Sequence, residues 1–489
     1  MTLDRRTFLK VGGLTALASG APSCGRSSDP RAVEPTGPAD YTLRIGTGLV
    51  ELAPDRILAT TVYNGQFPGP LMRLREGRPV TVDLYNDTDT PEQLHWHGQI
   101  VPVDVDGAAE EGTPDIPPHG HRRMTFTPAP AGVRFYHTHN HAGPDLRVGQ
   151  YSGQVGIVYV EPKDNPGAYD QEVFLMLKEF DPAFSRGGDM PADFLAGEAN
   201  NELHDTGEFA MRASLAKGMP HGFEVGYQSF AINGKMLGHG EPIRVKANER
   251  VLIHVVNGSA TEIRSLALPG HTFEVVALDG NPVPTRVEVP VLWIGTGERV
   301  SAVVRMTHPG AWILGDLSDD DRAHGMGVVI EYSGAKGKPQ WIAPQATKWD
   351  YSRFGKADAT VPAQDATIDM VFSKDNATVN GFNRWLINGA AFSMEKRQPM
   401  FPIQRGKRYR LRMRNASDDI HPMHLHRHSF ELTKVAGRQT AGVVKDVVML
   451  AGYQEIEVDF TANSTGLSLF HCHMQLHMDY GFMALFDCR

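Results

Sequence analysis

One pattern occurs three times along this chain of 489 residues, and it restricts the folds that the chain can adopt. In each copy an Asn-Gly pair is followed by a short strand-like segment, a tight turn and an alternating apolar stretch that ends in Asn. The copies begin at Asn64, Asn233 and Asn388, and their final stretches end at Asn86, Asn257 and Asn415. One Asn-Gly pair would indicate only a hairpin turn. Three complete copies predict three domains of one architecture.

The segments between the copies are also typical of β structure. Short apolar runs are broken by Gly, Pro, Asn and Asp, which favours strands joined by turns. We therefore predict an all-β protein of three consecutive β-sandwich domains with Greek-key links. The boundaries are placed near residues 165 and 340, where stretches with Pro, Gly and Lys occur. The predicted parts are residues 1–39, 40–165, 166–340 and 341–489.

The N-terminus has the pattern of a bacterial export signal. Arg5 and Arg6 precede a short apolar stretch from Val11 to Ala21, which is typical of the twin-arginine route. The alternative is a chance Arg-Arg pair before an ordinary secretory signal. The apolar stretch is too short to span a membrane as a stable helix. We predict an exported protein, periplasmic or on the cell surface, with residues 25–39 as a tether.

The cysteines and the charge limit the partners. The only cysteines are Cys24, Cys472 and Cys488, so no disulfide framework is expected. Cys24 either leaves with the signal or carries a lipid anchor, since the residues before it resemble part of a lipoprotein cleavage box. That anchor would be the only membrane contact. A net charge of -9 argues against a nucleic-acid partner. We expect a monomer.

Histidine pairs separated by one residue are far more frequent than chance allows. Random placement of the 21 histidines predicts roughly one such pair, whereas the sequence has seven. All of them lie in residues 95–141 and 421–477. The segments of interest are His95-Trp96-His97-Gly98, His137-Thr138-His139, His421-Pro422-Met423-His424-Leu425-His426, and the stretch from His471 to His477.

The triplet His471-Cys472-His473 indicates two metal sites joined by one strand. Successive side chains of an extended strand point to opposite faces. The two histidines would then face one metal centre and the cysteine another, a few covalent bonds apart. This arrangement suits an enzyme that takes up electrons at one site and uses them at another.

The four segments, in this order, resemble the copper motifs of three-domain multicopper oxidases of the laccase type, and the resemblance covers residues 40–489. It implies cupredoxin-type domains and four copper ions: one type 1, one type 2 and two type 3. By this resemblance, Cys472, His421 and His477 bind the type 1 copper, and His95 and His424 bind the type 2 copper. The type 3 pair would be bound by His97, His137, His139, His426, His471 and His473.

The axial position of the type 1 copper departs from the pattern of many bacterial relatives. Phe482 lies ten residues after Cys472, where those relatives have methionine. Phenylalanine cannot ligate, so we expect a three-coordinate copper with a raised reduction potential. Met483 could replace Phe482 as the axial neighbour if the strand has a bulge.

Proton delivery is the second departure. Met478 follows His477 at a position where several bacterial relatives have an acid that delivers protons to the cluster. Asp106, in Val105-Asp106-Gly107, matches the acid that the family has near the type 2 copper, and it is our predicted proton donor. The alternative role for Asp106 is that of a turn residue before Gly.

Four further residues lie within or beside the motifs. Arg427 stands where many laccases have Gly, either as a surface residue or as one that narrows the approach to the cluster. His141 and His428 are expected next to ligands or at the surface. Asp419 is predicted at the rim of the type 1 site, where it would accept a proton or hydrogen bond from a phenol. Its alternative role is that of a charged loop residue.

The sequence supports several functions to different degrees. We predict an oxidase that removes single electrons from phenols or aromatic amines and reduces O2 to water. A second hypothesis is an oxidase of cuprous or other metal ions for copper tolerance, although the 19 methionines form no evident cluster. A third is a copper-free scaffold of the cell envelope, which would lack the ligands. A copper nitrite reductase would not need the six type 3 histidines.

Overall fold

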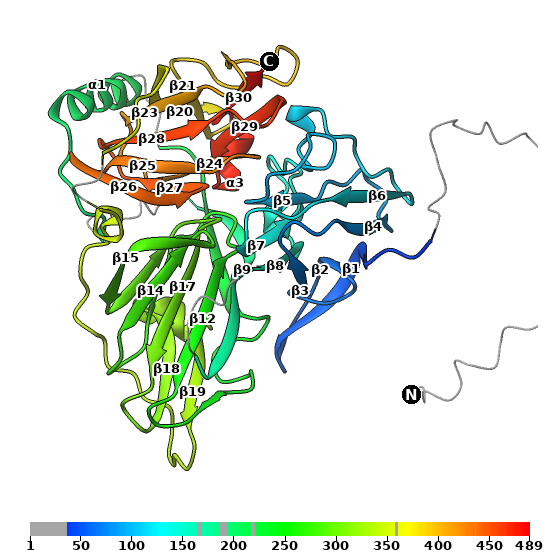
Figure 1. Ribbon diagram of the computed structural model, residues 1–489, viewed down its shortest axis with the longest axis vertical. Coiled ribbons are helices and arrows are strands. Elements are labelled where there is room, and N and C mark those ends of the chain that lie inside the picture. The colour runs from blue at the N-terminus through cyan, green and yellow to red at the C-terminus, as the bar shows by residue number, and fades with distance from the viewer. Residues whose placement is uncertain (1–36, 164–168, 186–193, 217–220, 357–359, 436) are drawn as a thin grey trace, which may run out of the picture. The chain divides into compact units, whose positions relative to one another are not determined.

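The computed structural model describes residues 37–163, 169–185, 194–216, 221–356, 360–435 and 437–489. Strands account for 51% of the structure and helices for 8%, and the strands form six sheets in three consecutive pairs (Figure 1). The predicted fold of three cupredoxin-like β-sandwiches is confirmed. The predicted export signal and Cys24 lie outside the described residues. No helix in the described part of the chain is long and apolar enough to cross a membrane.

The first sandwich has sheets of strand order β2-β1-β4-β6 and β3-β8-β7-β5. Its elements are β1 (Tyr41–Ala53), β2 (Arg56–Tyr63), β3 (Gly69–Arg75), β4 (Val80–Asn86), β5 (His95–His97), η1 (Ala109–Glu111), β6 (His121–Phe126), β7 (Gly132–His137), η2 (Gly149–Tyr151) and β8 (Val155–Glu161).

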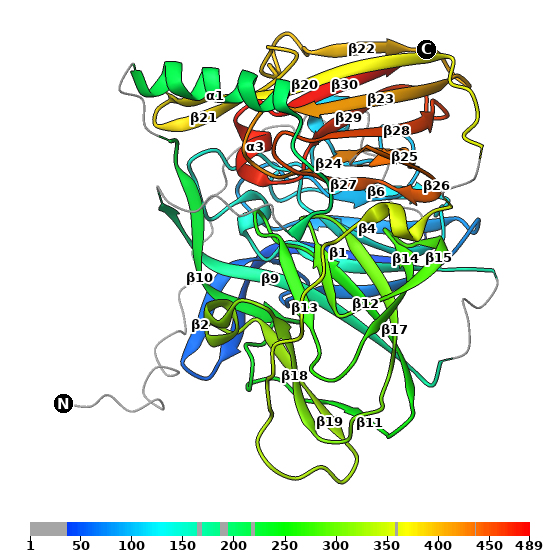
Figure 2. The ribbon, with the colours of Figure 1, turned by 90° about the vertical axis from the view of Figure 1, so that its left-hand side faces the viewer.

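The second sandwich has sheets of strand order β10-β9-β12-β17-β14-β15 and β11-β19-β18-β13-β16. Its elements are β9 (Gln171–Ser185), α1 (Asn201–Ala216), β10 (Glu224–Ile232), β11 (Ile243–Val245), β12 (Arg250–Asn257), β13 (Arg264–Ala267), β14 (Phe273–Leu278), β15 (Asn281–Val289), β16 (Val291–Ile294), β17 (Arg299–Arg305), β18 (Ala311–Asp316), α2 (Asp319–Ala323) and β19 (Gly327–Tyr332). Helix α1 lies beside β20 of the third sandwich (Figure 2).

The third sandwich has sheets of strand order β21-β20-β23-β28-β25-β26 and β22-β30-β29-β24-β27. Its elements are η4 (Tyr351–Phe354), β20 (Ala366–Val379), β21 (Phe382–Ile387), β22 (Met400–Ile403), β23 (Arg408–Asn415), β24 (His421–Leu425), β25 (Phe430–Val435), β26 (Arg438–Lys445), β27 (Val447–Leu450), β28 (Glu455–Thr461), β29 (Gly466–Cys472), α3 (Gln475–Asp479) and β30 (Met483–Cys488). The exact boundaries at residues 165 and 340 stay predictions.

The repeated Asn-Gly pair forms the same turn in each sandwich. Asn64 and Gly65 have φ angles of 53° and 68°, and the other two pairs match them. Asn and Gly are the residues that adopt positive φ at both central positions of a type I′ turn. The Asn64 side chain also accepts a bond from Arg44 N and donates one to Thr42 O. Asn233 and Asn388 make equivalent bonds to β9 and β20.

The asparagine that ends each repeat fixes the loop that follows it. In the third sandwich, buried Asn415 donates to Asp419 O at 2.7 Å and to Ala451 O at 3.1 Å, and it accepts from Ser417 N. The Ser417 hydroxyl in turn lies 2.9 Å from His421 Nε2. The repeat thus leads the chain into β24 and orients the first histidine of that strand.

Strands β24 and β29 are buried along most of their length. In β23, by contrast, burial alternates, with Tyr409, Leu411 and Met413 inside. All five residues of β24 are buried, as are the last five of β29. One face of these strands packs on the interior of the third sandwich, and the other faces the first sandwich. Polar side chains on β24 and β29 are therefore removed from water on both faces.

Candidate metal centre

The pairing of β24 with β29 sorts the histidines and the cysteine onto two faces. The strands are antiparallel, with Met423 opposite Cys472 and His424 opposite His471. Directly opposite residues share a face of the sheet. The His471 and His473 rings lie 5.7 Å apart, whereas the Cys472 sulfur belongs to a separate group of ligand atoms. The two-faced arrangement predicted from the triplet is the one that the structure has.

The cysteine face holds a group of three donors. His421, Cys472 and His477 each offer one atom within 4.8 Å of the others, and all three are buried. Cys472 Sγ lies 3.8 Å from His421 Nδ1 and 3.5 Å from His477 Nδ1. Trp385, which the sequence did not single out, packs against both imidazoles with ring centroids at 5.0 and 4.1 Å. Two imidazoles and one thiolate are the donors of electron-transfer copper.

Phe482 lies beside this group, and Met483 lies on the opposite face of the sheet. The Phe482 ring is fully buried, with its centroid 4.7 Å from that of His421. Met483 is paired opposite His471, so its side chain shares the face of His471 rather than that of Cys472. Its apolar neighbours include Met478 and Leu469. The geometry favours Phe482 over Met483 as the axial neighbour.

The other face holds eight imidazoles, which come from the first and third sandwiches. They fall into two groups of three and one facing pair. The groups are His97, His137 and His473, then His139, His426 and His471, and the pair is His95 with His424, whose Nε2 atoms lie 3.4 Å apart. All eight are buried. The structure therefore brings together every histidine that the sequence assigned to a cluster.

The ring nitrogens of these residues fit metal ions. His137 Nε2 and His139 Nε2 are buried and have no hydrogen-bond partner among the described residues. Such groups are costly unless something else binds them. The opposite nitrogen is often held, as in the contacts of His95 Nδ1 with Asp106 O at 2.9 Å and His424 Nδ1 with Asp446 O at 2.8 Å. A bond on one nitrogen leaves the other free to ligate.

Burial also sets the protonation state that metal binding needs. It lowers the pKa of His471 to about 4 and that of His477 to about 3. Burial raises the pKa of the Cys472 thiol well above its usual range. The imidazoles of His471 and His477 are thus neutral at pH 7 and ready to ligate, whereas the Cys472 thiol must lose its proton when metal binds.

Three buried carboxylates of the first sandwich lie beside the cluster, of which the sequence predicted only Asp106. Asp106 Oδ2 lies 2.7 Å from His426 Nδ1 and 3.3 Å from His95 Nδ1, and its Oδ1 has no partner among the described residues. Glu110 and Glu111 of η1 are also buried. Glu111 accepts a bond from Leu469 N, and Glu110 contacts His141 Nε2 at 2.5 Å. No short motif marked these two acids, because only the fold brings η1 to the cluster.

Arg427 is neither a surface residue nor a group pointing at the ligands. It is 4% exposed, with φ of 57°. Its guanidinium donates to Val101 O at 3.0 Å, to Thr465 O at 2.8 Å and to Leu467 O. It therefore ties the first sandwich to the third. His428 is buried, and its Nδ1 lies 3.1 Å from His426 O.

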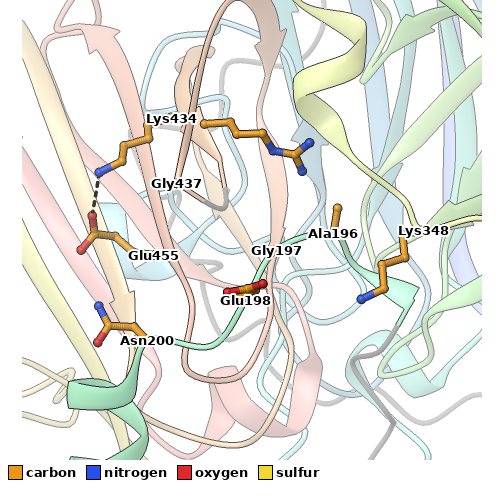
Figure 3. A pocket seen from close by; sticks show the side chains of 9 residues that line it. Ala196, Gly197, Glu198, Asn200, Lys348, Lys434, Gly437 and Glu455 are labelled. Atoms are coloured by element: carbon orange, nitrogen blue, oxygen red, sulfur yellow. Dashed lines mark ion pairs between the residues drawn. The ribbon is translucent and has the colours of Figure 1, made fainter.

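Two cavities differ in their relation to the donors. The larger, of about 670 Å³, is lined by charged side chains such as Lys348 and Lys434 and contains none of the histidines (Figure 3). The other, of about 290 Å³, reaches His477 and Asp419. Asp419 was predicted at this rim, but its carboxylate is held by Lys374 Nζ at 2.5 Å. Lys374 also pairs with Asp418, so the rim carries less net charge than its acids suggest.

Three sandwiches with a Cys-His₂ group beside an eight-histidine cluster define a class of multicopper proteins, and comparison with known proteins agrees. Multicopper oxidase family models match residues 50–165, 200–330 and 360–489. The multicopper oxidase MmcO of Mycobacterium tuberculosis is 27% identical over 99% of this chain and 96% of that protein. Copper resistance protein A of Pseudomonas syringae pv. tomato is 30% identical over 62% of this chain and 52% of that protein.

Solved structures show the same fold. The multi-copper oxidase from Pseudomonas thermotolerans has a TM-score of 0.68 and 23% identity, covering 92% of this chain and 98% of that one. The laccase from Botrytis aclada has a TM-score of 0.70 and 19% identity, covering 91% of this chain and 87% of that one. The chain belongs to the multicopper oxidase family and is an oxidoreductase. Proteins of this family use copper, O2 and a reducing substrate.

Proposed function

We propose that this protein couples the one-electron oxidation of phenols or aromatic amines to the four-electron reduction of O2 to water. The observation that carries the proposal is the Cys472 strand, which has a Cys-His₂ group on one face and a cluster of eight imidazoles on the other. Bound copper would supply the one-electron redox chemistry at the first group and the reduction of O2 at the second.

The proposed ligands account for four copper ions. His421, Cys472 and His477 would hold the type 1 copper, and the facing pair His95 and His424 the type 2 copper. One type 3 copper would be held by His97, His137 and His473, and the other by His139, His426 and His471. The two groups of three histidines support this assignment, which goes further than the sequence resemblance.

The chain itself provides the path between the two sites. His477 lines the smaller cavity, and its Nδ1 faces Cys472 Sγ. From Cys472 the backbone continues directly to His471 on one side and His473 on the other. Electrons would thus enter at His477 and reach both type 3 sites through a few covalent bonds. The carboxylate of Asp106, between His426 and His95, would hold a proton at Oδ1 for the reduction of O2.

Phe482→Met should lower the reduction potential of the type 1 copper. A thioether sulfur beside His421 would add a weak axial donor that stabilises the oxidised ion. A tenfold preference for the oxidised ion lowers the potential by about 59 mV, and we expect a fall of that order. A redox titration of the blue absorption band measures it. Met483→Leu, on the opposite face, serves as the control. A potential that changes with Met483→Leu and not with Phe482→Met would contradict the assignment.

The smaller cavity supports a small reducing substrate. Its volume of about 290 Å³ is at the low end for ligand pockets, which suits one substituted aromatic ring. It lies between the second and third sandwiches, and its walls include Glu224, Glu262 and Asp419. An aromatic ring in this cavity would reach His477, the ligand at which we propose that electrons enter.

Asp419→Asn should weaken the use of phenols. Loss of one hydrogen bond to a phenol hydroxyl corresponds to about a two- to tenfold rise in the Michaelis constant. A reductant that carries no proton should show little change. Steady-state kinetics with both substrates measures the difference, and Asp418→Asn, the other acid on Lys374, is the matched control. Equal effects of Asp419→Asn on both substrates would contradict the proposed contact.

Oxidation of metal ions is the second candidate, and the acids of the same cavity favour it. Glu224, Glu262 and Asp419 could attract a cation, and a relative is named copper resistance protein A. Among the residues that the structure describes, Met474 is the single methionine that lines this cavity. Rates with a methoxyphenol and with Cu(I) would decide between the two candidates. The copper-free scaffold is less well supported, because such a protein would lack the buried groups of histidine and cysteine donors that could hold metal ions.

Export by the twin-arginine route to the periplasm or cell surface stays a prediction. The removal or lipidation of Cys24 and the monomeric state do so as well.

A further inference from the structure

The second sandwich contributes no predicted ligand, yet its residues reach the histidine cluster. The turn before β17 contains Gly297, with φ of 77°, and a Cβ at this position would lie 2.7 Å from the ring of His473. The first residue of β17 is Arg299, which is fully buried. Its guanidinium reaches Asp446, which lies between β26 and β27 of the third sandwich. All three sandwiches therefore meet at the cluster.

Arg299 donates two parallel hydrogen bonds to Asp446. Arg299 Nη1 lies 2.6 Å from Asp446 Oδ1, and Arg299 Nη2 lies 2.6 Å from Oδ2. Both side chains have no exposed surface. A bidentate pair of this kind fixes the plane of the carboxylate as well as its position. Arg134 of the first sandwich adds a third contact, at 3.3 Å from Asp446 Oδ2.

Asp446 in turn holds two of the predicted ligands. Its Oδ1 lies 3.1 Å from His97 Nε2, and its backbone oxygen lies 2.8 Å from His424 Nδ1. The two imidazoles stack with ring centroids 3.8 Å apart. A carboxylate bonded to the outer nitrogen of a ligating histidine fixes the tautomer and the orientation of the ring. Asp446 therefore determines which ring nitrogen remains free to bind metal in His97, a predicted type 3 ligand, and in His424, a predicted type 2 ligand.

A glycine beside the Arg299–Asp446 pair lets these two side chains pack closely against the backbone of the first sandwich. Gly98, of the His95-Trp96-His97-Gly98 motif, has φ of 77°. A Cβ on Gly98 would lie 2.5 Å from Arg299 Nη2 and 2.8 Å from Asp446 Oδ2. Asp279 of the second sandwich accepts bonds from Arg299 N at 3.0 Å and Asp446 N at 3.2 Å. The glycine of this copper motif is thus explained by the Arg299–Asp446 pair that packs on it.

We propose that Arg299 of the second sandwich is a positioning residue for the trinuclear copper cluster, and that it acts through Asp446 on His97 and His424. The second sandwich is then part of the oxygen-reducing site and more than a spacer. This inference rests on the proposed function, because it concerns the ligands of the proposed cluster. The type 1 group lies on the other face of β29 and should not depend on Arg299.

Arg299→Lys tests the inference, since lysine keeps the charge but cannot bind both carboxylate oxygens. Copper-loaded protein is titrated with a copper chelator while three signals are followed: the blue absorption of type 1 copper, the type 2 electron paramagnetic resonance signal and copper per chain. We expect cluster copper to be lost at roughly 10- to 100-fold lower chelator concentration, the usual cost of an outer-shell change. The type 2 signal should also change shape, and the blue absorption should stay.

Two further variants serve as a replacement for Arg299→Lys and as its control. Asp446→Asn preserves the shape of the side chain and should give the same changes, so it replaces Arg299→Lys if that variant does not fold. Arg264→Lys is the matched control, because Arg264 is equally buried in the second sandwich but contacts Asp321 and Phe230. It should lower stability without changing the type 2 signal.

Failure of the positioning role of Arg299 and failure of the proposed function would give different results. Suppose that Arg299→Lys and Asp446→Asn keep as much cluster copper as Arg264→Lys and show the same type 2 signal. This result would overturn the inference about Arg299 and leave the proposed function standing. Equal loss of blue absorption and cluster copper would also overturn the inference about Arg299, since it would indicate general unfolding. Wild-type protein that binds no cluster copper would overturn the proposed function and this inference together.

Discussion

Cys472→Ser should abolish the blue colour of the copper-loaded protein and its oxidation of phenols, while most cluster copper stays bound. A serine hydroxyl does not supply the soft thiolate that the type 1 site needs. The variant also removes the donor that connects the two sites. The loss of activity should therefore exceed the roughly 10- to 100-fold cost of changing an outer-shell residue. Absorption spectroscopy, metal analysis and oxygen consumption measure the three effects.

Cys488→Ser is the matched control, because Cys488 is the other cysteine among the described residues. It is also buried, and its Sγ lies 3.8 Å from Ala462 O, away from the predicted ligands. The control should remain blue and active. Retention of the blue band in Cys472→Ser, or its loss in Cys488→Ser, would contradict the assignment of the type 1 site.

Asp106→Asn should slow the reduction of O2 and leave the oxidation of substrate intact. The amide keeps the shape of the side chain between His426 and His95 but cannot transfer a proton as a carboxylic acid can. Removal of a positioned acid typically costs about 10²- to 10⁴-fold in rate. Rapid-mixing measurements separate the two half-reactions. Anaerobic bleaching of the blue band by a phenol should be normal, and its return with O2 should be slow.

Asp104→Asn provides the control for this prediction, since Asp104 is an exposed acid of the same loop. It should leave both half-reactions unchanged. A normal rate of reoxidation in Asp106→Asn would show that Asp106 is only a structural residue that holds His426 and His95. In that case Glu110 and Glu111, which are also buried beside the cluster, would be tested next.

The fold could be predicted because each copy of the repeat contains the residues that its turn requires. Asn64, Asn233 and Asn388 occupy turns that need positive φ, and they tie each turn to the neighbouring strand. The same residues therefore recur wherever the same sandwich is built. Helix α1 was not predicted, because it is an insertion between β9 and β10 that belongs to no repeat.

The two-faced arrangement of the Cys472 triplet could also be predicted, because side chains alternate along a strand. His471, Cys472 and His473 must be consecutive if one strand is to serve two sites. The residues that surround the predicted ligands have no fixed spacing in the sequence. Asp446, Glu110 and Trp385 reach the site from separate turns and strands, so only tertiary packing identifies them. For the same reason the sequence did not reveal that Lys374 holds Asp419, or that Arg427 is buried.

We propose that one chain holds a type 1 copper and a separate three-copper cluster. Anomalous X-ray diffraction at the copper edge, from crystals of the copper-loaded protein, tests it most directly. If this proposal is correct, the map has four peaks: one among His421, Cys472 and His477, and three among the eight remaining predicted histidine ligands. A map without a peak beside Cys472, or with fewer than three peaks in the cluster of a fully loaded protein, would contradict it.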